Sequence, residues 1–302
     1  SCKMSGKSFR MINTILFWLE ISSLFSLPMT LLSWLVIFVY SLKEGGNIIN
    51  GIAALIGISF AHLATNLFDD YIDYKNLTDN SQKCKCAYIK EGKASLNDVL
   101  KVVVIYCFIA CLTGLFLFLR CGFPVIWLAV IGGIITLIYA KLSQKGMSEI
   151  AVGLAFGPLL FEGVYFVMTG NFSYTVLVMS LAVVMFTIGL MYVHTLLDFE
   201  GDMSAHKKTL VCRIGNKGLA LKGVFVVYGL GYLFTVMLSF MLNNYLILLT
   251  LALIPLVFNM YNSLKTYTCG GDVKEFYFRL LKARNLMVYY SILLTVFLFI
   301  KS

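Results

Sequence analysis

Apolar stretches of membrane-spanning length recur along almost the whole chain. They lie at residues 18–41, 48–69, 99–119, 122–140, 149–168, 174–197, 219–241, 245–263 and 284–301. A helix needs roughly 20 apolar residues to cross the hydrocarbon core of a bilayer, where it satisfies its own backbone hydrogen bonds. The chain is 60% hydrophobic and only 13% charged. We therefore predict an all-α membrane protein of nine transmembrane helices, with residues 1–302 forming a single domain.

The basic residues are sorted between the predicted connections. With the N-terminus in the cytoplasm, 21 of the 24 lysine and arginine residues fall on the cytoplasmic side, leaving Lys43, Arg120 and Lys301 outside. This is the asymmetry of the positive-inside rule. It accounts for the net charge of +9 without a nucleic-acid partner. We predict a multi-pass protein of the cell membrane with a cytoplasmic N-terminus, in contact with membrane lipid.

The first polar cluster follows the second apolar stretch. Asn66 and Asp70 are four residues apart, as are Asp69 and Asp73, so these side chains gather on one side of a helix within about two turns. Carboxylates repel one another, and a helix C-terminus already carries partial negative charge. A divalent cation of hard character is the natural partner of such a group. The cluster predicts a Mg2+ site at the cytoplasmic end of the helix.

A second acidic helix end occurs at residues 198–202. Asp198 and Asp202 share a helix face, and the basic residues Lys207 and Lys208 follow. Two such ends, each followed by lysines, suit Mg2+ ions that bridge a diphosphate whose outer oxygens meet the lysines. We predict that the metal ligands are Asp69, Asp70, Asp73, Asp198 and Asp202, and that the mouth of the site is cytoplasmic.

Both motifs resemble those of the UbiA-type intramembrane prenyltransferases, especially the 1,4-dihydroxy-2-naphthoate prenyltransferases of menaquinone biosynthesis. The first motif of that family is matched by Asn66, Leu67, Asp70, Tyr71, Asp73 and Asp79. The middle of the chain is matched by Gly146, Glu149, Ile150, residues 156–159, Gly163, Tyr165 and Gly170. The second motif is matched by Asp198, Asp202, Ala205, Lys207, Thr209, Leu210, Arg213 and Gly215. Together, in order and at the family spacing, these matches are specific for the superfamily.

The resemblance implies a UbiA-like helical bundle with a central cavity. It also implies Mg2+-dependent transfer of a polyprenyl group from an isoprenoid diphosphate to an aromatic acceptor, 1,4-dihydroxy-2-naphthoate or a related quinone precursor, with release of pyrophosphate. The five aspartates and Lys207 would then be catalytic. Substrate binding would fall to Asn66, Asp79, Lys141, Lys145, Tyr165 and Lys208, with Lys141 or Lys145 holding an anionic acceptor.

The chain departs from the family pattern at four positions of the two motifs. Asp69 replaces the usual second asparagine, Leu77 a glycine, Leu197 an arginine and His206 a glycine. Asp69 adds a carboxylate and so favours metal binding. The change at Leu197 concerns the acceptor, whose identity the motifs leave open.

Two other functions remain as alternatives. In a UbiA-type terpene cyclase, the carbocation would be attacked by its own chain and no acceptor would be needed. A cation transporter would favour carboxylates at the bilayer midplane instead of at two helix ends followed by lysines. The roles of Glu162, His62 and His194 stay open, because each lies in an apolar stretch where a hydrogen-bonded packing residue is an equal or better interpretation.

Overall fold

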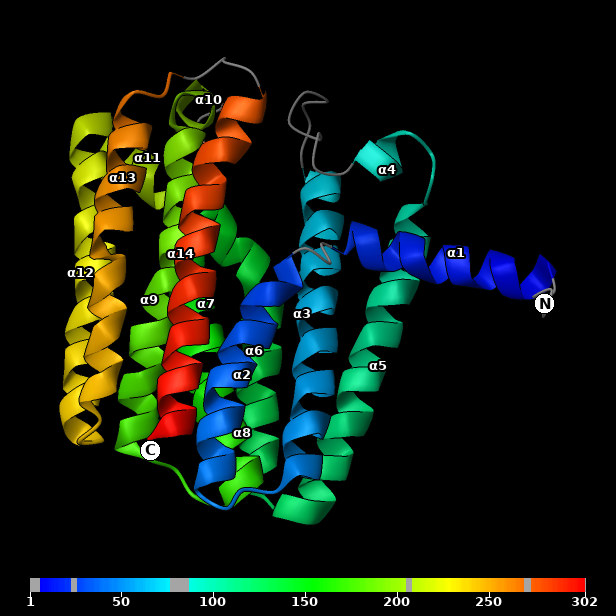
Figure 1. The fold of residues 1–302 in the computed structure, drawn as a ribbon. Helices are drawn as coiled ribbons and strands as arrows, with labels where there is room; N and C mark the ends of the chain where they lie inside the picture. The colour runs from blue at the N-terminus through cyan, green and yellow to red at the C-terminus, as the bar shows by residue number, and fades with distance from the viewer. Residues whose placement is uncertain (1–5, 23–25, 77–86, 205–207, 269–272, 302) are drawn as a thin grey trace.

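The computed structural model describes residues 6–22, 26–76, 87–204, 208–268 and 273–301. These residues form a bundle of roughly parallel helices (Figure 1). The helices in chain order are α1 Gly6–Ile21, α2 Leu27–Lys43, α3 Ile48–Asn76, α4 Ala87–Lys90, α5 Leu96–Cys121, α6 Pro124–Gln144, α7 Ser148–Leu154, α8 Leu160–Thr169, α9 Tyr174–Leu197, α10 Phe199–Ser204, α11 Leu210–Ile214, α12 Lys217–Met241, α13 Ile254–Lys265 and α14 Val273–Ile300. A π-helical segment, Ala155–Leu159, joins α7 to α8, and a 3-10 segment, Tyr245–Leu253, precedes α13.

The described part of the chain contains seven helical stretches long and apolar enough to cross a membrane. They are Ile48–Lys75, Leu96–Cys121, Ser148–Thr169, Tyr174–Leu197, Lys217–Met241, Tyr245–Lys265 and Val273–Ile300. Two further apolar helices, Leu27–Lys43 and Pro124–Tyr139, are shorter. The all-helical membrane fold is confirmed, whereas the predicted count of nine transmembrane helices is not.

The predicted continuous helix over residues 18–41 is wrong. The structure has two helices there, α1 ending at Ile21 and α2 beginning at Leu27. Pro28 lies in the first turn of α2, where its missing N–H costs no helical hydrogen bond. In the interior of a continuous helix over residues 18–41, the same proline would remove a hydrogen bond, so it favours a helix start at this position. Helix α1 projects sideways from the bundle (Figure 1).

Helices α3 and α9, which carry the acidic motifs, run in the same direction. Both begin at the end of the bundle where α8 connects to α9, and both finish at the opposite end (Figure 1). Helix α3 continues through the first motif to Asn76, whereas the sequence had predicted a helix ending at residue 69, within that motif. Helix α9 ends at Leu197, and α10 follows directly. Both motifs therefore lie at one end of the bundle, the end where α10 is labelled in Figure 1.

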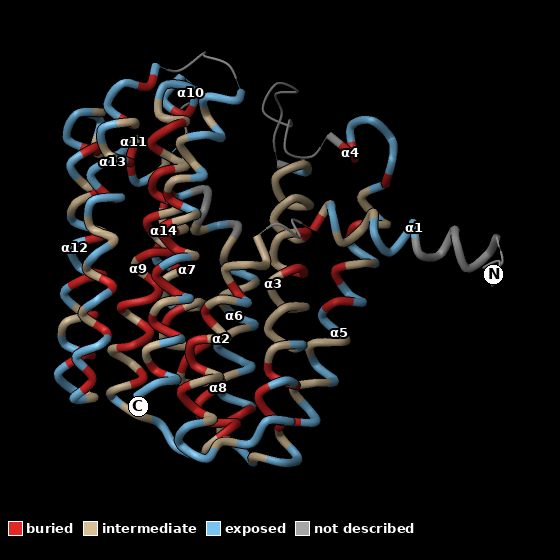
Figure 2. The backbone as a smooth tube through the Cα atoms, viewed as in Figure 1, coloured by how far each residue is buried: buried red, intermediate tan, exposed pale blue. Residues whose placement is uncertain are grey.

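Apolar packing divides the described molecule into two clusters. The larger includes α2, α8, α9, α12 and α14, with the fully buried side chains of Phe161, Phe186 and Tyr290. The smaller joins the upper half of α3 to α1, α4 and α5 through Leu63, Leu67 and other apolar residues. Figure 2 shows the buried residues concentrated along α9 and α14, with mostly intermediate exposure along α3. The first acidic motif belongs to the smaller cluster and the second to the larger.

Close packing of α9 on α12 depends on a glycine. A Cβ atom at Gly189 would lie 2.5 Å from the ring of Tyr228, which is fully buried and has no room to move. We expect Gly189→Ala to lower the melting temperature of the detergent-solubilised protein, because overpacking of this kind costs about 1–3 kcal/mol. Gly229→Ala is the matched control, since a Cβ there meets nothing within 4 Å. Equal melting temperatures for the two variants would contradict this account.

Candidate active site

The first acidic motif occupies two turns of α3, and its aspartate side chains interact with residues of two other helices. The hydroxyl of Tyr88, on α4, donates a hydrogen bond to Oδ2 of Asp70 at 3.1 Å. Asp69 and Asp73 instead interact electrostatically with Tyr139 on α6, and Oδ1 of Asp69 is buried. Leu67 anchors this stretch of helix, because it is fully buried in the smaller apolar cluster. The packing of Leu67 thus fixes the orientation of this stretch of α3 about the helix axis, and with it the positions of the three aspartates.

One turn earlier, Asn66 and His62 tie α3 to the break between α1 and α2. The amide of Asn66 donates to the carbonyl of Ser22 at 3.1 Å and to the hydroxyl of Ser26 at 3.2 Å. His62 is hydrogen-bonded to Ser26 at 3.2 Å and to Thr30 at 2.8 Å. These bonds account for the polar character of both side chains within an apolar segment, so His62 is a satisfied interior histidine.

The second acidic motif lies where α9 passes into α10. Asp198 caps α9, and the N–H of Asp202 donates to its carbonyl at 2.8 Å, which keeps the two residues one helical turn apart. Asp202 is buried, with 5% of its surface exposed. The ring of His194 lies one turn before Asp198, with Nδ1 3.5 Å from Oδ2 of that carboxylate. His194 therefore belongs to the second motif.

The turn between α6 and α7 packs against the segment that follows the second motif. Gly146 in this turn is buried at φ +68°, and a Cβ there would lie 1.4 Å from the carbonyl oxygen of Lys208. Arg213, on α11, donates to the carbonyl of Lys145. The side chain of Thr209 caps α11 by accepting from the N–H of Cys212 at 3.2 Å. The position of the second motif thus depends on this turn.

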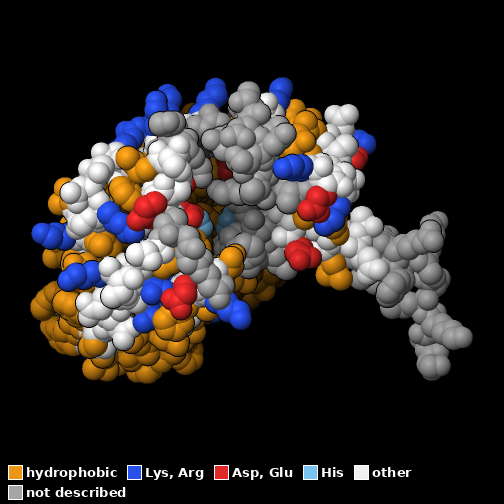
Figure 3. Space-filling view, turned by 90° about the horizontal axis from the view of Figure 1, so that it is seen from above, with side chains coloured by type: hydrophobic (Ala, Val, Ile, Leu, Met, Phe, Trp, Pro, Cys, Tyr) orange, Lys and Arg blue, Asp and Glu red, His pale blue; other side chains and the backbone are white. Residues whose placement is uncertain are grey.

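A hollow opens at this end of the molecule. Figure 3 looks onto it and shows acidic and histidine side chains inside, with lysines and arginines around the rim. The two acidic motifs lie at this end of the bundle, one on the part of α3 that packs in the smaller apolar cluster and one where α9, in the larger cluster, passes into α10.

Of the other predicted site residues that the structure describes, the lysines lie near the acidic motifs and Tyr165 does not. Lys141, Lys145 and Lys208 are exposed at the same end as the acidic motifs. Tyr165 lies on α8 at the opposite end, where its ring stacks on that of Tyr40 with centroids 6.0 Å apart, so the structure does not bring it together with the aspartates. Asp79 and Lys207 fall outside the described residues.

The carboxylate oxygens of the two acidic motifs are chemically suited to bind Mg2+. Carboxylate oxygens are the ligands this ion prefers, and it is usually held by one or two carboxylates together with water and substrate phosphates. Within the described ranges, no three histidine, cysteine or acidic side chains form a ready-made metal cage. Such a cage is not required of a metal that a diphosphate helps to hold. Asp69, Asp70 and Asp73 on one side, and Asp198 and Asp202 on the other, fit this role.

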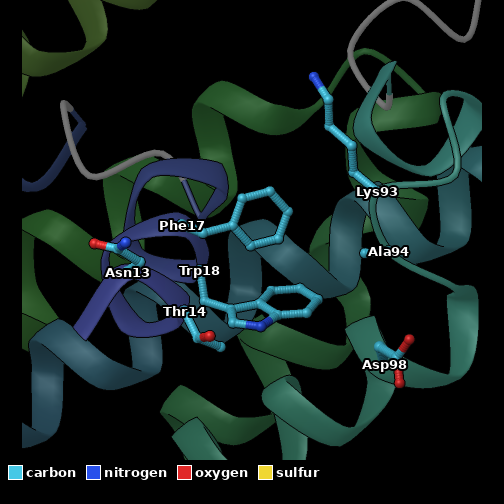
Figure 4. A pocket seen from close by; sticks show the side chains of 7 residues that line it. All are labelled: Asn13, Thr14, Phe17, Trp18, Lys93, Ala94 and Asp98. Carbon is cyan, nitrogen blue, oxygen red and sulfur yellow. The ribbon is translucent and has the colours of Figure 1, made fainter. Parts of the chain in front are cut away.

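A separate pocket lies outside this site, between α1 and the connection from α4 to α5 (Figure 4). It is lined by Asn13, Thr14, Phe17, Trp18, Lys93, Ala94 and Asp98. Asp98 also completes a capping box with Ser95, whose hydroxyl accepts from the N–H of Asp98 at 3.2 Å. None of the predicted site residues lines this pocket.

Three residues of the site were not predicted from the sequence: Tyr88, Tyr139 and His194 as a neighbour of Asp198. The signal for His194 was present, because it precedes Asp198 by one helical turn. Tyr139 and Tyr88 come from other segments, and only the packing of α6 and α4 on α3 brings them to the carboxylates.

A bundle of apolar helices with two acidic motifs at one end defines an integral membrane protein with an acidic site at that end. The chain belongs to the UbiA prenyltransferase family, whose sequence pattern matches residues 26–282. This match covers most of the chain and includes both acidic motifs. It assigns the protein to a family of enzymes.

Individual relatives are distant. A 1,4-dihydroxy-2-naphthoate octaprenyltransferase of Bacillus subtilis (strain 168) is 23% identical over 176 residues, which is 55% of this chain and 55% of the relative. The chain therefore matches about half the length of that protein. A structure of digeranylgeranylglyceryl phosphate synthase is 16% identical, with a TM-score of 0.65 over 95% of this chain and 99% of that one. A UbiA homologue from Archaeoglobus fulgidus bound to GPP and Mg2+ is 13% identical, with a TM-score of 0.61 over 92% and 99%. At these identities the structures establish the shared fold.

Proposed function

We propose that this protein transfers a polyprenyl group from an isoprenoid diphosphate to an aromatic acceptor and releases pyrophosphate. The observation that carries the proposal is the pair of acidic motifs on α3 and α9–α10, which lie at one end of the bundle, the end at which a hollow with acidic side chains opens. The fold shared with a homologue bound to GPP and Mg2+ supports it. The proposed acceptor is 1,4-dihydroxy-2-naphthoate or a related quinone precursor, in keeping with the Bacillus relative.

The proposed division of labour follows from the charge that develops when an allylic diphosphate ionises. Mg2+, held by Asp69, Asp70 and Asp73 on α3 and by Asp198 and Asp202 on α9–α10, would neutralise the departing diphosphate. Lys207 and Lys208 would stabilise the same charge from outside, and Lys141 or Lys145 would hold an anionic acceptor. Asn66, whose amide nitrogen donates to Ser22 and Ser26, would help to orient the diphosphate or a metal-bound water. Groups that bind the leaving group more tightly as its charge grows lower the barrier.

We also propose that the acidic end of the bundle faces the cytoplasm of a cell membrane. Lys43, Arg120 and Lys301, the basic residues assigned to the outside, lie at or just beyond the C-terminal ends of α2, α5 and α14. In Figure 1 these helix ends are opposite α10. On this proposal the remaining basic residues of the chain would belong to cytoplasmic segments.

The test is incubation of the purified, detergent-solubilised protein with farnesyl or geranylgeranyl diphosphate, Mg2+ and 1,4-dihydroxy-2-naphthoate, with mass spectrometry of the lipid extract. We expect a prenylated naphthoate that requires the acceptor and disappears with EDTA. Formation of a cyclic hydrocarbon without acceptor would show that the protein is a terpene cyclase and not a transferase. Product formation unaffected by EDTA would overturn the role of Mg2+.

A further inference from the structure

Glu149 is a buried acid in the first turn of α7 that the metal-binding motifs do not use. Only 8% of its surface is exposed. Its Oε2 atom accepts a hydrogen bond from the hydroxyl of the neighbouring Ser148 at 3.2 Å. Its Oε1 atom is buried and has no hydrogen-bond partner among the residues that the structure describes. A buried carboxylate oxygen without a partner is costly, so its retention suggests a ligand.

The groups around Glu149 place it beside the proposed active site. It interacts electrostatically with Tyr139 on α6 and with Tyr192 on α9. Tyr139 also interacts electrostatically with Asp69 and Asp73, so Glu149 and the first acidic motif share one neighbouring phenol group. The hydroxyl of Tyr192 already donates to the carbonyl of Ala220 at 2.6 Å. No described lysine or arginine forms an ion pair with Glu149.

The backbone around Glu149 fixes its position relative to the second motif as well. The turn that precedes α7 packs through Gly146 against the carbonyl of Lys208. Glu149 therefore lies on an element that contacts both halves of the site, through Tyr139 on one side and the Lys208 segment on the other. A group placed there is close to where donor and acceptor would meet.

We propose that Glu149 binds the acceptor, with Oε1 accepting a hydrogen bond from one of its hydroxyl groups. This inference rests on the proposed prenyl transfer. A carboxylate oxygen accepts hydrogen bonds, so Oε1 favours hydroxyl-bearing acceptors, with the carboxylate of a naphthoate directed toward the lysines at the rim. A charge-assisted hydrogen bond in a shielded site is among the stronger polar contacts available. Glu149 thus determines which acceptors bind, while the aspartates serve the donor.

The test compares Glu149→Gln with the wild-type protein under the same transfer assay. We expect the KM for 1,4-dihydroxy-2-naphthoate to rise about tenfold, because the carboxylate is replaced by an amide, which is a weaker hydrogen-bond acceptor. The KM for the isoprenoid diphosphate should change less than about twofold, since the donor and Mg2+ contact other residues. The melting temperature should not fall, because Oε1 makes no hydrogen bond with the described residues that the variant would lose.

Glu162→Gln is the matched control. Glu162 is a half-buried carboxylate on α8, where Oε2 accepts from the N–H of Ser173 at 3.2 Å near the opposite end of the bundle. Neither KM should change in this variant. A tenfold change in the acceptor KM of Glu162→Gln would show that loss of any partly buried acid has this effect, and it would overturn the specific role of Glu149.

A competitive inhibitor without hydroxyl groups supplies the second readout. Inhibition by 2-naphthoate should be equal in the wild-type and Glu149→Gln proteins, because this molecule offers Oε1 no donor. The proposal is overturned if Glu149→Gln leaves the acceptor KM unchanged, or if it raises the donor KM as much as the acceptor KM. It is also overturned if the substitution weakens inhibition by 2-naphthoate to the same extent as it raises the acceptor KM. Absence of transfer by the wild-type protein would instead refute the proposed function on which the inference rests.

Discussion

Replacement of Asp198 by asparagine is expected to reduce the turnover of prenyl transfer by about 100- to 1,000-fold, the usual effect of removing one preorganised group that stabilises transition-state charge. Asp198 caps α9, and its side chain is 42% exposed beside His194. Asparagine keeps its size but gives up the negative charge that would attract Mg2+. The measurement is kcat at saturating donor and acceptor over a Mg2+ titration.

The same substitution should leave the fold intact or make it slightly more stable. A carboxylate at a helix C-terminus is unfavourable by roughly 0.3–1 kcal/mol, and the contact with His194 at 3.5 Å is half-exposed and contributes little. We therefore expect the melting temperature of Asp198→Asn in EDTA to equal or exceed that of the wild type. The control is Glu91→Gln at the same end, because Glu91 is exposed and pairs with Lys93. Full turnover by Asp198→Asn would remove the aspartate from the proposed metal site.

Much of the fold follows from the apolar segments alone. Each stretch of roughly 20 apolar residues must form a helix in a bilayer, because no water is present to satisfy its backbone. The Ser95 cap was equally predictable, since Asp98 stands three residues later and completes a capping box. The position of both acidic motifs at one end also follows from the alternation of helix direction.

The helix boundaries were less predictable where polar residues do not interrupt a helix. Helix α3 continues through Asp69, Asp70 and Asp73 to Asn76, because spaced polar side chains are compatible with helical backbone once they emerge from the apolar region. The π-helical segment before α8 contains Pro158, which donates no backbone hydrogen bond, and Gly157, which adopts non-helical angles. We have no physical account of the 3-10 geometry at Tyr245–Leu253.

The chemical types of the site residues were predictable, but their neighbours were not. The spacing of Asp198 and Asp202 predicts one helix face, and the backbone hydrogen bond between them agrees with it. The burial of Glu149 and its approach to Tyr139 depend instead on how α6 and α7 pack against α3 and α9. Periodicity in one segment contains no information about such contacts between segments. Tyr165 illustrates the same limit, since the structure places it at the far end of the bundle.

Gly146→Ala is expected to abolish most of the transfer activity and to lower the melting temperature by several degrees. Gly146 adopts φ +68°, a conformation that costs an L-residue roughly 1–2 kcal/mol. Its Cβ atom would also lie 1.4 Å from the carbonyl oxygen of Lys208, so the two backbone segments must separate. That movement would displace the segment following Asp202 and, on our proposal, the lysines that meet the diphosphate.

Gly170→Ala separates the two contributions. Gly170 has φ +81° at the C-terminus of α8, yet a Cβ there meets nothing within 4 Å, so this variant carries the backbone strain without the clash. We expect it to lose some stability but to keep its turnover, whereas Gly146→Ala should lose both. If the two variants behaved alike in melting temperature and turnover, the contact between the α6–α7 turn and Lys208 would not position the second motif. A selective loss of turnover in Gly146→Ala would instead tie the geometry of the acidic site to that single backbone contact.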